Sequence, residues 1–148
     1  MWVHVALAAL SGFFLPLQAV INARTSNVLG GPLWAALVNF GGGFFILLIV
    51  LTAIRAQTPT LEQVGRVPSY GWIAGAFGIF FVAQAAFTVP KLGAAAMISL
   101  VVAGQMFGSM AYDHFGVLQA PHPVTWEKAL GAVLLLAGVF LILRPDRG

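Results

Sequence analysis

The sequence predicts an all-α membrane protein with five transmembrane helices, and three observations lead to this fold class. First, 60% of the 148 residues are hydrophobic and only 7% are charged, whereas soluble domains carry about 25% charged residues. Second, the chain contains five apolar runs of roughly 20 residues, the length of one bilayer crossing. Third, runs of this length cross lipid as helices, because a helix satisfies its own backbone hydrogen bonds.

The five predicted helices make one integral membrane domain over residues 1–148. The first run lacks a basic leader, so we expect a membrane helix there and not a cleaved signal peptide. Gly30-Gly31-Pro32 should separate the first two helices, and Pro90-Lys91 should form a tight hairpin between the third and fourth. Polar loops are expected at 55–69 and 113–123. The helices are expected at about 3–23, 32–54, 70–89, 92–112 and 124–143.

Positive charge is divided almost evenly between the two sides of the membrane that five crossings define. One side receives Arg24, Lys91, Arg144 and Arg147, and the other, which holds the N-terminus, receives Arg55, Arg66 and Lys128. So small a bias sets orientation weakly. Two interpretations remain open. Either the N-terminus faces out with a weak preference, or inverted copies pair as an antiparallel, dual-topology homodimer, a ten-helix inverted-repeat transporter fold.

The first run contains residues that an ordinary membrane anchor would not need. Pro16 removes one helical hydrogen bond and presses against the carbonyl of Gly12, so this pair is a candidate hinge. Gln18 and Asn22 follow one turn apart, on one helix face. This pattern favours a helix that lines a cavity, with both amides as candidate substrate-binding groups.

Three further amides extend this candidate site. Asn39 and Gln84 are expected at a depth similar to that of Gln18, and Gln105 lies nearer the middle of its run. We expect all of them to line a polar cavity that binds substrate. Amides also bridge membrane helices, at about 0.6 kcal/mol on average, so a purely structural role remains the alternative for each.

No carboxylate lies deep in any run, which argues against proton-coupled cation export through an embedded glutamate. The nearest titratable groups are Asp113 and His114, which with Arg24 are candidates for a gate or proton relay. The histidines lack the spacing of metal ligands, and the chain has no cysteine. The sequence therefore predicts no enzyme, metal or cofactor, and the net charge of +3 gives no reason to expect a nucleic-acid partner.

Small residues predict where helices meet. Gly131 and Gly138 are seven apart and share one face of the last helix. Close backbone approach through small residues is a main source of helix association in lipid. We expect these two glycines at the dimer interface.

Several motifs together resemble the short YdcZ-like family of the drug/metabolite transporter superfamily. They are Pro16-Leu17-Gln18-Ala19-Val20-Ile21-Asn22, Val89-Pro90-Lys91-Leu92-Gly93, Val101-Val102-Ala103-Gly104-Gln105 and Asp113-His114-Phe115-Gly116. The resemblance implies an antiparallel homodimer in a bacterial inner membrane that transports a small molecule. The spacing of the two glycines in the last helix is similar to the dimer motif of small multidrug exporters. The first helix, however, lacks the membrane-embedded glutamate of those exporters, and Gln18 is the residue nearest to that role. A structural or accessory membrane subunit without transport remains the alternative function.

Overall fold

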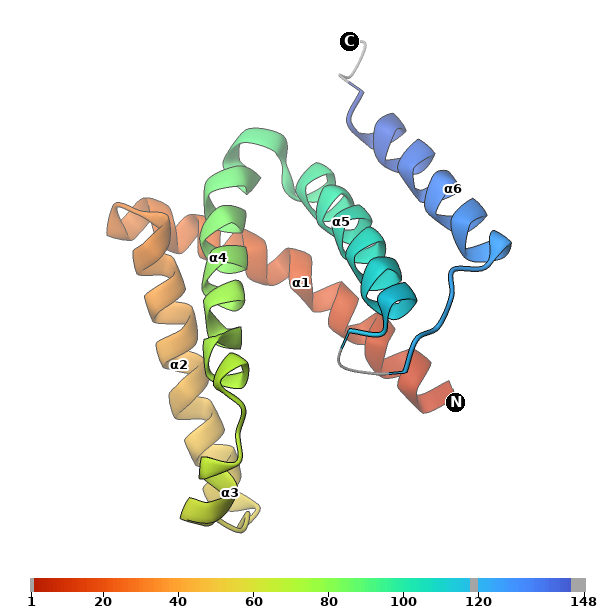
Figure 1. Ribbon diagram of the computed structural model, residues 1–148. Coiled ribbons are helices and arrows are strands. Elements are labelled where there is room, and N and C mark those ends of the chain that lie inside the picture. The colour runs from red at the N-terminus through yellow and green to blue at the C-terminus, as the bar shows by residue number, and fades with distance from the viewer. Residues whose placement is uncertain (1, 118–119, 145–148) are drawn as a thin grey trace. The chain divides into compact units, whose positions relative to one another are not determined.

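The computed structural model describes residues 2–117 and 120–144, and every regular element in these ranges is a helix. This confirms the all-α class. The chain divides into two compact units, Met1–Lys91 and Leu92–Gly148, and the prediction of one integral domain stays a prediction. The helices, labelled in Figure 1, are α1 (Trp2–Leu29), α2 (Pro32–Ala53), α3 (Leu61–Gly65), α4 (Ser69–Leu92), α5 (Ala94–Phe115) and α6 (Trp126–Ile142).

In the first unit, α1 and α2 form a helical hairpin around a two-glycine turn. The amide of Gly31 donates to the carbonyl of Ser26 over 2.9 Å, and Gly30 has a left-handed φ of 78°. This is the Schellman ending that glycine favours. The face of the hairpin is built from small residues, since Ala19, Ala23, Ala35 and Ala36 are all buried, and small side chains let two backbones approach closely.

Helix α1 is longer than the apolar run that predicted it. It continues past Ala23 to Leu29 because the polar residues after the run still form helix, and Thr25 bonds the carbonyl of Ile21 over 3.0 Å. Pro16 lies inside this helix without ending it. A proline can be tolerated here because it removes only one backbone bond, and membrane helices accommodate such breaks locally.

The loop expected at 55–69 contains the short helix α3, which the apolar pattern did not indicate. The signal was present in a different form. Thr60 accepts from the amide of Gln63 while the Gln63 side chain accepts from the amide of Thr60, a complete capping box. Such a reciprocal pair satisfies two backbone donors that would otherwise lack partners.

The tight hairpin expected at Pro90-Lys91 is wrong. Helix α4 runs through both residues to Leu92, and the break falls at Gly93. Pro90 lies in the last turn, where its missing N–H costs a single helical bond. Gly93 has a φ of +81°, a left-handed value that glycine adopts without steric cost. The break between α4 and α5 therefore falls at the glycine and not at the proline.

The second unit consists of α5 and α6, which pack against each other. Ala103, Ala132 and Val139 are buried there. Helix α5 extends through Asp113 and His114, which the sequence had put at the start of a loop, and ends at Gly116 with a φ of 67°. The amide of Val117 donates to the carbonyl of Tyr112 over 2.9 Å, a second Schellman ending.

Four of the described helices are long and apolar enough to cross a membrane: α1, α2, α4 and α5. Helix α6 is equally apolar in character but has 17 residues. A typical crossing takes about 20 residues, with a range of roughly 17–25. Four crossings are thus supported by length and composition, and the fifth stays a prediction.

Candidate functional site

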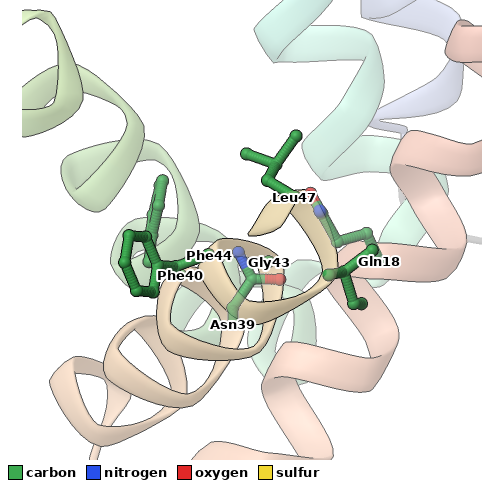
Figure 2. A pocket seen from close by; sticks show the side chains of 7 residues that line it. Gln18, Asn39, Phe40, Gly43, Phe44 and Leu47 are labelled. Atoms are coloured by element: carbon green, nitrogen blue, oxygen red, sulfur yellow. The ribbon is translucent and has the colours of Figure 1, made fainter. Parts of the chain in front are cut away.

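A cavity of about 660 Å³ opens along the α1–α2 hairpin. Two predicted amides, Gln18 from α1 and Asn39 from α2, contribute to its wall. Figure 2 shows Gln18 reaching from α1, with the other labelled side chains carried by α2. The remaining lining residues are Phe40, Gly43, Phe44, Ile46 and Leu47. The lining therefore combines two amides, two aromatic rings and aliphatic groups, without an ionisable side chain.

The α2 contribution follows from helix periodicity. Asn39, Gly43 and Leu47 are four residues apart, so they form one stripe along the helix. The aromatic part of the lining comes from Phe40 and Phe44 of the same helix. The spacing from Asn39 to Gly43 was the available signal, because a glycine one turn from an amide leaves space beside it.

The cavity is open on one side in the single chain. Gln18 is exposed and Asn39 is half-buried, while Phe44 and Leu47 are 57% and 61% exposed. An amide in the hydrocarbon layer needs hydrogen-bond partners, because an unsatisfied polar group there costs several kcal/mol. These amides are therefore suited to face protein, water or a polar solute, and poorly suited to face lipid tails.

The other three predicted amides do not line this cavity. Asn22 is buried, with 4% of its surface exposed, on the α1 face that also buries Ala19 and Ala23. Gln84 is half-buried in α4 and accepts from the Thr88 hydroxyl over 3.5 Å. Gln105 is exposed on α5, in the second unit. The prediction that these three bind substrate has no support from this cavity and stays a prediction.

Phe40 also contacts α4, which fixes one edge of the cavity. A Cβ built on Gly78 would lie 2.8 Å from the Cζ atom of the Phe40 ring. Only a glycine therefore fits under this ring as it stands. Gly78 thus positions a cavity residue from a helix that contributes no lining side chain.

A smaller cavity of about 220 Å³ lies in the second unit, at the end of α5. Asp113, one of the predicted gate or relay residues, contributes to its wall together with residues that were not predicted for a site. His114 is placed differently, because its Nδ1 atom accepts from the amide of Val124 over 3.4 Å. The full lining is Met106, Ser109, Met110, Asp113, His122, Val124 and Lys128.

The predicted hinge, gate and dimer residues on α1 and α6 line neither of these two cavities. Gly12 is exposed, with open space around a Cβ built on it, and Arg24 is exposed on α1. Gly131 faces α5 of its own chain, since its Cβ would lie 3.8 Å from the Met106 Cε atom. Gly138 has open space beside it. The hinge, gate and dimer roles of these residues stay predictions.

These features define the protein class: a polytopic, all-helical membrane protein with a polar and aromatic cavity inside its apolar spans. The chain belongs to the YdcZ family. The family model described as "Putative inner membrane exporter, YdcZ" matches residues 3–141. The chain is also 27% identical over 140 residues to Inner membrane protein YdcZ of Escherichia coli (strain K12), with 95% of this chain and 94% of that protein aligned. No solved structure matches it.

This relationship confirms the resemblance inferred from the motifs and the localisation inferred from it. The protein is a multi-pass protein of the inner membrane. The family description also supports membrane transport as its class of function.

Proposed function

We propose that this protein is a small-solute transporter that works by alternating access as an antiparallel homodimer. The observation that carries the proposal is the open cavity, in which Gln18 and Asn39 present amides inside the span of two apolar helices. A cavity left half-open by one chain requires a cover, and an inverted second copy would supply a symmetric one. Helix α6 would make the fifth crossing, and Gly131 and Gly138 would help to hold the pair.

The lining favours a solute that is neutral or zwitterionic. Amides both donate and accept hydrogen bonds, while Phe40 and Phe44 offer apolar surface for a solute's body. A net-charged solute would find no counter-ion among the lining residues. In this scheme Gly12 and Pro16 supply the hinge that lets one half of α1 reorient, and Arg24, Asp113 and His114 act at the gates.

The test of transport begins with a thermal-shift screen of the purified protein against metabolites, because a ligand that binds the folded state raises its apparent stability. Flux of the identified solute is then measured in proteoliposomes. Gln18→Ala is expected to reduce flux to background while leaving assembly intact, and Gln57→Ala, in the polar loop, is expected to leave flux unchanged.

The alternative is an accessory membrane subunit whose amides only bridge helices. It is favoured if Gln18→Ala dissociates the protein and no solute is ever carried by the wild type. Equal flux in the Gln18→Ala and Gln57→Ala proteins would also remove the assigned role of Gln18.

Orientation requires a separate experiment. C-terminal reporters that are active on opposite sides of the membrane should both give signal if copies insert both ways. Signal from a single side would reject dual topology, and with it the antiparallel pair.

A further inference from the structure

The second cavity has a composition unlike that of the first. Asp113 and Lys128 bring one negative and one positive side chain to a space of about 220 Å³, and His122 lies beside them. This volume is below the roughly 300–1,000 Å³ of pockets that enclose drug-sized ligands. A cavity of this size can enclose a small charged group of a ligand while the rest of the ligand stays outside.

The loop that contributes His122 is fastened to the helix that contributes Asp113. The His122 amide donates to the Asp113 carbonyl over 2.7 Å. The His122 Nδ1 atom lies 2.7 Å from the Ala120 carbonyl. Because a carbonyl can only accept, Nδ1 is the donor there, and Nε2 is the acceptor nitrogen of the corresponding tautomer. The carboxylate and this imidazole thus form one acceptor edge of the cavity.

Lys128 lines the same cavity and forms its donor edge. It lies in the first turn of α6, where its amide is capped by the Thr125 hydroxyl over 3.5 Å. Its ammonium is a compact charge suited to a phosphate oxygen. The two edges together are complementary to a group that carries a phosphate and a primary ammonium, and that has no net charge.

Polarity also changes along the cavity wall. Met106, Met110 and Asp113 are three to four residues apart on one face of α5, and all three line the cavity. Asp113 is in the last turn of this apolar helix, so the charged rim lies toward the membrane surface and the methionines lie deeper. A ligand that matches this order has a polar head at the surface and an apolar body directed into the bilayer.

We propose that this cavity binds the head group of a zwitterionic phospholipid with a primary amine, of the phosphatidylethanolamine class. The ammonium would donate to Asp113 and His122, and the phosphate would accept from Lys128. A carboxylate accepts from more than one donor at once, so other bonds of Asp113 are compatible with this role. Phosphatidylcholine has no N–H to donate, and phosphatidylglycerol would bring an unbalanced negative charge to Asp113.

The experiment measures the melting temperature of the purified, detergent-solubilised protein with each of these three lipids. Phosphatidylethanolamine is expected to raise it by about 2–4 °C more than the other two. Asp113→Asn and Lys128→Gln should each remove this difference. Their controls, Glu62→Gln and Lys91→Gln, each remove one charge of the same sign outside the cavity and should preserve it. Soluble phosphoethanolamine is tested in parallel, and a rise with it alone would identify a soluble zwitterion as the source of the same chemistry.

Native mass spectrometry of the wild-type protein provides a measurement that does not depend on the folding of variants. Phosphatidylethanolamine adducts should outlast those of the other two lipids as collision energy increases. Equal stabilisation by all three lipids, or a preference that survives both Asp113→Asn and Lys128→Gln, would overturn the proposal.

Discussion

The two cavities of this protein use opposite chemistry, although both lie along apolar helices. The one on the α1–α2 hairpin is lined by Gln18 and Asn39 and has no ionisable side chain. The one at the end of α5 is lined by Asp113, His122 and Lys128. The difference follows position along the helix. Asn39 lies well inside its span, whereas Asp113 is in the final turn of its own.

This comparison shows what the bilayer permits at each depth. Insertion scales put an aspartate or lysine at the helix centre at about 2.5–3.5 kcal/mol, and this cost falls toward the ends of the span. Amides provide hydrogen bonds deep in the membrane without that cost. Charges, with their stronger and more selective recognition, are retained where head groups and water can solvate them.

The largest expected effect comes from placing a charge in the uncharged cavity. Asn39→Asp keeps the size of the side chain but should destabilise the inserted protein by about 2–3 kcal/mol, because an ionisable group enters the span. Ser109→Asp, the corresponding change in the charged cavity, should cost less than about 1 kcal/mol because Lys128 lines the same cavity and the site is close to the surface. Membrane yield and melting temperature measure both. Equal losses would show that the two cavities do not differ in depth.

An intermediate effect is expected from the glycine under Phe40. Gly78→Ala places a Cβ where only 2.8 Å separates it from the ring, so the ring must move and the cavity wall changes. Gly75 lies on the same helix, and a Cβ built on it meets open space. Gly75→Ala is therefore the control, because both substitutions gain up to about 1 kcal/mol in helix propensity.

The readout for this pair is the difference between the two variants. Gly78→Ala should be about 1 kcal/mol less stable than Gly75→Ala and should bind the transported solute more weakly. Identical solute affinity in the two proteins would mean that Phe40 does not shape the site.

The smallest expected effect concerns the donor edge of the charged cavity. Thr125→Ala removes the cap that holds the first turn of α6, worth about 0.5–2 kcal/mol for such caps, and it should loosen Lys128. Hydrogen exchange of residues 126–130 should increase, and the preference for phosphatidylethanolamine should weaken. Thr60→Ala removes the corresponding cap of α3 in the polar loop, and should increase exchange there without changing lipid preference. Unchanged exchange at 126–130 would show that the cap does not order this turn.

Much of the fold was readable from composition and periodicity. The long apolar runs predicted the membrane helices. The family motifs predicted the inner-membrane location and the class of protein. Errors occurred where local residues can adopt two conformations. Pro90 suggested the end of a helix, but one missing bond near a helix end is tolerated, and the break falls at the left-handed Gly93 instead. The end of an apolar run was taken as the end of a helix in α1, although a helix can continue into polar sequence.

The site was predictable only in part, for a related reason. Periodicity places residues on a face of one helix, and it correctly indicated that Gln18 and Asn39 belong to polar positions inside apolar spans. It cannot show which helix faces which. Asn22, one turn after Gln18 on α1, is buried, while Gln18 lines the cavity.

By itself, the sequence determined that this is a helical inner-membrane protein with amides, and no embedded acid, inside its spans. These properties depend on the hydrophobicity and length of local segments. Only the tertiary structure decided that Gln18 and Asn39 share one cavity with Phe40 and Phe44, and that Asp113, His122 and Lys128 share another. Those groupings depend on the packing of separate helices, which is set by small residues and turns acting together.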